Sequence, residues 1–222
     1  NRGIRAMPRR ALIDHRPWLL ASITAAIAYY FLWDNPLGGL WLILLKGAAV
    51  GFLTIYAMRR GKGLDGAILT LALALSAAAD MVLELNFYAG GALFFVSHVV
   101  AISLYLRNRR APHEASWGAA ALAMLLLTPL TTYLLSQSPI VAGYSVGLAG
   151  MAAAAWQSRF PRHRVAAGAI LFIVSDWLLF SQLGPLDLAP LPDLLVWPLY
   201  YAAQLLIATG VVQTLRGELK VR

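Results

Sequence analysis

The sequence contains no cysteine. This absence excludes disulfide-stabilised scaffolds, thiolate-bound zinc, iron–sulfur clusters and cysteine nucleophiles. Charged residues are also scarce, at 13% of the chain, whereas they make up about a quarter of soluble domains. Aromatic residues make up 11%, which argues against a disordered chain, because disordered chains are rich in charge and poor in aromatics. The composition therefore fits neither an ordinary soluble domain nor a disordered one.

Long apolar runs occupy most of the chain. Hydrophobic residues make up 60% of it, and eight runs of roughly 17–23 residues are long enough to cross a bilayer as helices. None of them alternates as a membrane β-barrel strand does. We predict an all-α polytopic membrane protein with one eight-helix transmembrane domain over residues 1–222, of which 1–16 form a basic N-terminal segment. The predicted helices span residues 17–33, 37–58, 64–85, 88–106, 115–135, 139–157, 164–183 and 193–215.

The charges predict the orientation of these helices. All but one of the 18 Lys and Arg residues fall on one side of an eight-helix topology, in segments 2–16, 59–62, 107–110, 159–164 and 216–222. The other side carries acidic residues and neither Lys nor Arg. The positive-inside rule then predicts that both termini are cytoplasmic. The net charge of +8 reflects topology and contact with membrane lipids, and we predict no nucleic-acid partner, because the basic residues are divided among five short segments.

A faint internal repeat relates the third and seventh predicted helices. In both, a small residue precedes an Asp, and two apolar residues and a Leu follow it. The segments are "SAAADMVLEL" around Asp80 and "GAILFIVSDWLL" around Asp176. The match predicts two four-helix halves in the same orientation, as in a parallel repeat. Gly143, Gly147 and Gly150 form a small-residue face that suits either packing within the chain or a dimer, so the oligomeric state stays open.

Ionisable and polar residues inside the predicted helices are few. Such groups are costly in a bilayer and usually face a bundle interior or a cavity. Ser76, Asp80 and Glu84 are four residues apart and share one helix face. The groups that fall between the midplane and the non-cytoplasmic face are Lys46, Asp80, Glu84, His98, Asp176, Tyr200, Tyr201 and Gln204.

Most of these residues also have a purely structural interpretation. Lys46 suits an ion pair with Asp80 or Asp176, Glu84 a surface position at a helix end, and His98 a hydrogen bond between helices. Tyr200 and Tyr201 suit helix packing or an interfacial aromatic belt. The two aspartates are harder to explain in this way. One lysine cannot neutralise two buried carboxylates, so one of them is expected to stay protonated, and we predict a functional role for the pair.

Several familiar chemistries do not fit the sequence. A zinc hydrolase needs about three His or carboxylate ligands at one depth, and His98 is the only His within a predicted span. "GYSVG" at 143–147 has the letters of a serine-hydrolase elbow but not its strand–turn–helix context, and we interpret it as small residues for close packing. The G-x-G-D and Y-D motifs of intramembrane aspartyl proteases are absent. No phosphate loop or dinucleotide fingerprint occurs.

The ordered motifs resemble the YhhN-type lysoplasmalogenase family. The resemblance rests on "LLKGAAVGFL", "SAAADMVLEL", "GGALFFVSHVVAISLYL", "GAILFIVSDWLL" and "YYAAQLLIATGV", and it covers most of the chain. Family members often have Lys-Pro where this chain has Lys46-Gly47, and Gly where it has Ala79. The resemblance implies hydrolysis of the vinyl ether bond of 1-alkenyl lysophospholipids, with no metal or organic cofactor. It implies Asp80 and Asp176 as catalytic carboxylates. The supporting residues would be Lys46, Glu84, His98, Tyr200, Tyr201 and Gln204.

This chemistry also suits the residues themselves. An enol ether hydrolyses by protonation at its β-carbon, which creates an oxocarbenium-like cation that water then attacks. Two carboxylates in different environments can supply the acid and the anion, as they do in glycosidases. We assign the acid to Asp176, which has no acidic neighbour in its helix, and the anion and water base to Asp80. The reverse assignment stays open. Lys46 is alternatively a ligand for the head-group phosphate.

Two other functions fit the same residues. A small proton-coupled transporter would use the Asp pair as a proton or ion site, and a non-catalytic scaffold or lipid-binding protein would tolerate its replacement. Turnover of an ether lipid separates the hydrolase from both. The compact, Ala-rich chain with short loops predicts a bacterial inner membrane as its location. Head-group and chain-length preference cannot be predicted from the sequence.

Overall fold

The computed structural model of the chain describes residues 17–34, 38–110 and 115–219. The predicted basic segment 1–16 lies outside these residues. The described part is all-α, and its helices are α2 (Pro17–Leu32), α3 (Leu40–Arg60), α4 (Gly63–Leu83), α5 (Phe87–Arg107), α6 (Ala115–Ser136), α7 (Pro139–Gln157), the π-helical turn η1 (Arg162–Ala166), α8 (Ala167–Ser181) and α9 (Leu191–Leu215). The prediction of eight apolar helices is confirmed, and helix ends differ from it by at most three residues.

Most of these helices are long enough to cross a bilayer. Seven segments of the described chain pass this test: α3, α4, α5, the described part of α6, α7, η1 with α8, and α9. α2 is also apolar but shorter, at 16 residues. The chain is therefore an integral membrane protein.

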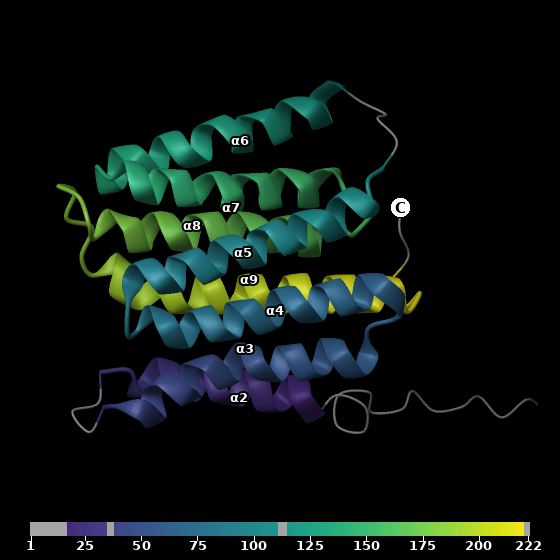
Figure 1. Cartoon of the computed structure of the whole chain (residues 1–222), viewed down its shortest axis with the longest axis horizontal. Coiled ribbons are helices and arrows are strands. Elements are labelled where there is room, and N and C mark those ends of the chain that lie inside the picture. The colour runs from purple at the N-terminus through teal and green to yellow at the C-terminus, as the bar shows by residue number, and fades with distance from the viewer. Residues whose placement is uncertain (1–16, 35–37, 111–114, 220–222) are drawn as a thin grey trace, which may run out of the picture.

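Six of the helices form a closed ring. Figure 1 shows the helices side by side with nearly parallel axes. Contacts between neighbours run in the order α3, α4, α5, α7, α8, α9 and back to α3, and α4 also contacts α9. α2 packs outside α3, and α6 packs outside α7 and α8. If α2, α3, α4 and α5 change places with α6, α7, α8 and α9 in that order, the order of helices around the ring stays the same. This is expected when two four-helix halves are related by a two-fold axis. α4 and α8, which carry the two aspartates, then occupy equivalent places on opposite sides of the ring.

Small residues bring the ring helices close together. A Cβ at Gly90 of α5 would lie 2.5 Å from the Cα of Leu83, and one at Gly168 of α8 would lie 2.9 Å from the carbonyl oxygen of Ala203 in α9. Such close approach is how helices associate in a bilayer, where apolar burial alone provides little driving force.

The two ends of the bundle differ in charge. The described Lys and Arg residues other than Lys46 lie at the end where α3, α5, α7 and α9 finish, which is the right-hand end in Figure 1. Asp34, Glu84, Asp187 and Asp193 lie at the opposite end. Among the described residues, the opposite end thus carries acidic residues and neither Lys nor Arg, as predicted, while Asp65 and Glu218 lie at the basic end in ion pairs with Arg residues. That the basic end faces the cytoplasm stays a prediction.

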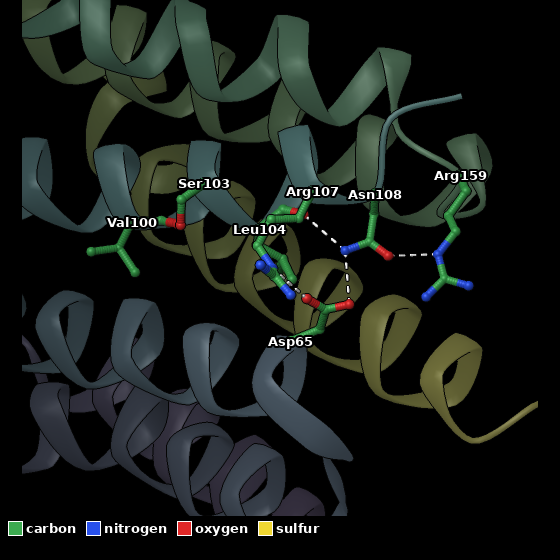
Figure 2. Close-up of polar contacts among 7 residues, drawn as sticks. All are labelled: Asp65, Val100, Ser103, Leu104, Arg107, Asn108 and Arg159. Carbon is green, nitrogen blue, oxygen red and sulfur yellow. Dashed lines mark hydrogen bonds and ion pairs between the residues drawn. The ribbon is translucent and has the colours of Figure 1, made fainter. Parts of the chain in front are cut away.

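A cluster of polar side chains fastens three helices at the basic end (Figure 2). The side chain of Asn108, at the end of α5, donates to Asp65 Oδ2 at 2.9 Å in the first turn of α4 and accepts from Arg159 Nε at 2.6 Å after α7. Arg107 Nε also donates to Asp65, at 3.1 Å. Asn108 is buried, so these bonds replace water that cannot reach its amide.

Asn108→Ala is expected to destabilise the protein by about 2 kcal/mol, because it removes two hydrogen bonds that the buried Asn108 side chain forms with the charged groups of Asp65 and Arg159. Thermal unfolding of the detergent-purified protein measures this loss. Ser103→Ala is the matched control, because among the described residues the Ser103 hydroxyl bonds only to the Val100 carbonyl of its own helix, on an exposed face. Equal stability of the two variants would contradict the role given to Asn108.

Candidate active site

The predicted polar residues of the bilayer interior converge near the acidic end of the ring. Five of them, Lys46, Asp80, Glu84, Asp176 and Tyr200, line a cavity of about 340 Å³ whose walls come from α2, α3, α4, α5, α8 and α9, whereas His98, Tyr201 and Gln204 do not line it. We call it the polar cavity. It is lined by Tyr29, Tyr30, Trp33, Lys46, Asp80, Leu83, Glu84, Phe94, Phe172, Ser175, Asp176, Leu179, Gln182, Pro192, Asp193, Val196, Trp197 and Tyr200. The two aspartates, from opposite sides of the ring, therefore face one space.

Asp80 is held by a tyrosine from α9. The Tyr200 hydroxyl donates to Asp80 Oδ2 at 2.7 Å, and Gln204 Nε2 donates to the Tyr200 oxygen at 3.3 Å. Tyr200 and Gln204 are one turn apart in α9, so both reach α4 from the same face. Asp80 is 1% exposed. This chain of hydrogen bonds fixes one carboxyl oxygen of Asp80 and leaves the other with no partner among the described residues.

Asp176 is held in the same way by a tyrosine from α7. The Tyr144 hydroxyl donates to Asp176 Oδ2 at 2.9 Å, and His98 Nε2 lies 3.1 Å from the same hydroxyl. A phenol has one proton to donate. When that proton is donated to Asp176, the Nε2–H of His98 is the donor to the Tyr144 oxygen. His98 is buried, and it acts on Asp176 through Tyr144 rather than by direct contact.

Lys46 forms its ion pair with Glu84 rather than with Asp80 or Asp176. Its ammonium binds Glu84 Oε1, which the Tyr29 hydroxyl also approaches at 3.4 Å. This corrects the expectation that Lys46 pairs with an aspartate. Glu84 lies one turn beyond Asp80, at the end of α4, and its longer side chain reaches across to α3. Glu84 is partly exposed, as expected for a surface residue at a helix end, and it also has an ion-pair partner in Lys46.

Tyr201 does not join this site. Its hydroxyl lies 2.7 Å from the Ser22 hydroxyl of α2, which in turn donates to the Ala49 carbonyl of α3 at 2.6 Å. Successive residues of a helix point about 100° apart, so Tyr200 and Tyr201 face different neighbours. Tyr201 fastens α9 to α2 and α3.

An apolar groove adjoins the polar cavity. It has a volume of about 480 Å³ and lies mainly between α5 and α7. Leu83, Phe94, Asp176 and Leu179 line both spaces. Asp176 therefore stands at the boundary between a polar compartment and an apolar one.

No group of three or more His, Asp or Glu in the described chain is arranged to hold a metal ion. The acidic groups of the site come as separate carboxylates, each with its own hydrogen-bond or ion-pair partner from a neighbouring helix. What this arrangement offers chemically is two fixed carboxyl groups beside a polar space.

Comparison with protein families supports the resemblance read from the motifs. The sequence model of the YhhN family matches residues 41–211. The chain belongs to the YhhN family. No curated protein and no solved structure gave a match.

The YhhN match contains both aspartates and every hydrogen-bond partner described for them. α2 lies before residue 41, where the YhhN match begins. Tyr29 and Trp33, which line the polar cavity, therefore come from a segment outside the match.

Sequence reasoning missed several residues of this YhhN site. Tyr144 is the most important, because it belongs to the "GYSVG" segment, whose small residues by themselves predict only close packing of helices. A tyrosine among small residues of a buried helix was the available signal, since a buried phenol needs a hydrogen-bond partner. Gln182 and Asp193 also line the cavity, and Gln182 Nε2 donates to Asp193 Oδ1 at 3.2 Å.

Proposed function

We propose that the protein is a hydrolase that cleaves the vinyl ether bond of 1-alkenyl lysophospholipids. The products would be a fatty aldehyde and glycerophosphocholine or glycerophosphoethanolamine. YhhN family membership supports the proposal. The observation that carries it is the pair of buried carboxylates, Asp80 and Asp176, which face one cavity and are each held by a tyrosine hydroxyl.

Proton transfer to carbon is the difficult step. Asp176, as the acid, gives its proton to the β-carbon of the vinyl ether, and the electron pair of the double bond forms the new C–H bond. The cation that results is shared between the α-carbon and the ether oxygen. Asp80 faces that cation as a carboxylate, which stabilises the charge as it develops. Asp176 suits the acid role because it borders the apolar groove, where the vinyl ether of an amphiphile would lie.

Water completes the reaction. It attacks the α-carbon while Asp80 takes one of its protons, which gives a hemiacetal. The hemiacetal then collapses: its hydroxyl proton goes to Asp176, the C–O bond to glycerol breaks, and Asp80 returns its proton to the leaving oxygen. Both carboxyl groups recover their starting state, and one water is consumed for each bond cleaved. The same pair thus serves twice as acid and base.

The polar cavity suits a zwitterionic head group. Lys46 is its only Lys or Arg among the described lining residues, whereas Glu84 and Asp193 are acidic. Tyr29, Trp33 and Trp197 add aromatic faces, which attract ammonium groups. In the proposed complex, Lys46 binds the phosphate, and the acidic and aromatic side chains surround the choline or ethanolamine cation.

Lys46→Met is expected to lower kcat/KM for the phospholipid substrate by roughly 10–100-fold, the range for loss of a charged hydrogen bond. The loss should be much smaller for 1-alkenyl glycerol, which has no phosphate. Aldehyde release from the two substrates measures the difference. Lys62→Met, which removes a lysine at the opposite end of the bundle, is the control. An equal loss on both substrates would mean that Lys46 does not bind phosphate.

The proposed function itself is tested on detergent-purified protein. Alkenyl lysophosphatidylethanolamine and lysophosphatidylcholine are supplied in turn, and fatty aldehyde is measured by mass spectrometry. Aldehyde formation that requires both aspartates is the expected result. No aldehyde from monodisperse protein with either head group would overturn the proposal and favour the transporter hypothesis, in which the Asp pair is a proton or ion site.

A further inference from the structure

The apolar groove between α5 and α7 opens because the two helices approach closely along only part of their length. A Cβ at Gly147 would lie 2.7 Å from the Phe95 ring, and one at Gly150 would lie 3.0 Å from Ile102 Cδ1. Nearer the acidic end, Gly91 of α5 and Gly143 of α7 have no atom within 4 Å of a Cβ built on them. The small-residue face of α7 is thus divided: Gly147 and Gly150 serve packing within the chain, and Gly143 leaves open space.

The groove is lined almost entirely by hydrocarbon. Apart from the Tyr88 and Tyr144 hydroxyls and the Asp176 carboxyl, the side chains of its walls are hydrocarbon, among them Phe87, Phe95 and Val141. Its volume of about 480 Å³ is within the range of roughly 300–1,000 Å³ for small-molecule sites. The lining gives a polar ligand few partners and suits an aliphatic one.

The rim of the groove lies on the outer surface of the bundle. Ile140 is 67% exposed, Tyr88 63% and Val96 47%. α5 and α7 are both long enough to cross the bilayer, so the rim opens outward between two membrane-spanning helices. A hydrocarbon chain can therefore pass between the bilayer and the groove without crossing water.

At its inner end the groove meets the polar cavity at Asp176. The continuity of the two spaces matches the form of a single-chain amphiphile, in which the bond to be cleaved lies between a polar and an apolar part. We propose that the apolar groove binds the alkenyl chain of the substrate, which enters sideways from the bilayer between α5 and α7. This proposal rests on the proposed function, and it adds the place and the route of the chain.

The groove orients the chain more than it adds affinity. Moving a hydrocarbon chain from lipid to an apolar groove exchanges one apolar medium for another, so the hydrophobic gain is small. What the groove supplies is a fixed position for the vinyl ether beside the acid. A misplacement of about 1 Å costs on the order of 100-fold in rate, so blocking the groove should affect kcat for long chains.

Filling the groove tests the proposal. Gly91→Leu and Gly143→Leu each place a side chain in open space, and both also favour the helix. Gly51→Leu is the matched control, because Gly51 is a mid-helix glycine of α3 that also has no atom within 4 Å of its built Cβ and lines neither cavity. Size-exclusion chromatography and circular dichroism check that all three variants are folded.

Aldehyde release is then compared for a hexadecenyl and a butenyl lysophosphatidylethanolamine. We expect the two groove variants to lose about 100-fold in kcat on the hexadecenyl substrate, to keep their rate on the butenyl one, and to differ in this from Gly51→Leu. Unchanged rates on the long chain, or equal losses on both chains, would overturn the groove proposal. Absence of aldehyde from the wild type with both substrates would instead overturn the proposed function.

A binding measurement separates the groove from turnover. A lysophosphatidylethanolamine with a diazirine at the end of a hexadecyl chain is cross-linked to the wild type by light, and the labelled peptides are identified by mass spectrometry. Labels on residues 87–96 and 140–144 are expected, with a strong loss in Gly143→Leu. Labels confined to other helices would overturn the assignment of the groove, whatever the activity assays give.

Discussion

Asp176→Asn is expected to lower aldehyde formation by about 1,000-fold, within the range for loss of a general acid. Asparagine has nearly the same shape as aspartate and can still accept the hydrogen bond that Tyr144 donates to Asp176 Oδ2 at 2.9 Å. It cannot deliver a proton to carbon. The protein should therefore fold normally and bind substrate while turnover is lost. Single-turnover aldehyde release and substrate binding, measured on the same preparation, separate the two effects.

Asp80→Asn should give a loss of similar size, because in the proposed mechanism Asp80 supplies both the negative charge that faces the cation and the base that activates water. Asp34→Asn is the control for both variants, since Asp34 lies at the same end of the bundle, is exposed and does not line the polar cavity. Full activity in both Asp80→Asn and Asp176→Asn would rule out the two-carboxylate mechanism.

The tyrosines should have the second-largest effect. Tyr144→Phe and Tyr200→Phe each remove the hydroxyl that donates to one of the two proposed catalytic carboxyls, and we expect each to lower kcat by about 100-fold, the low end for loss of one preorganised donor. KM should change little, because neither hydroxyl needs to contact the head group. A kcat loss without a KM change is the signature of positioning rather than of substrate binding.

Tyr201→Phe provides the contrast. Its hydroxyl pairs with Ser22, so its removal should lower the unfolding temperature and leave kcat close to that of the wild type. Steady-state kinetics and thermal unfolding of the three Phe variants give both quantities. A loss of kcat in Tyr201→Phe as large as in Tyr200→Phe would contradict the placement of Tyr201 outside the site.

The fold was largely predictable because membrane helices carry a strong local signal. Length and apolar content define each span, and clusters such as Arg59–Arg60 or Arg159–Arg162–Arg164 mark one end of the bundle. The depth of Asp80 and Asp176 along their helices is likewise predictable from residue position. The ring order is not, since a run of Leu and Ala does not specify which neighbour it packs against.

The partners of the site residues depend on that order. Lys46 reaches Glu84 and not an aspartate because α3 lies beside the end of α4, which residue spacing within one helix cannot predict. Tyr144 was missed for the same reason, since its role depends on α7 lying between α5 and α8. Helix geometry predicts that the side chains of Tyr200 and Tyr201 point in different directions. It does not predict which of the two faces α4. The depth of each group is thus a local property of the chain, whereas its partner is decided by packing.

The position of Asp176, with the polar cavity on one side and the apolar groove on the other, would also decide where the two products of the proposed reaction go. The proposed reaction cuts an amphiphile into one oil-soluble fragment and one water-soluble fragment at that boundary. The aldehyde would leave through the rim of the apolar groove between α5 and α7 and diffuse within the membrane. The glycerophosphodiester would leave the polar cavity for the aqueous phase. Because the two products would enter different phases, they would rarely bind together at the site again. Reversal of the reaction and product inhibition would then be slow without any moving gate.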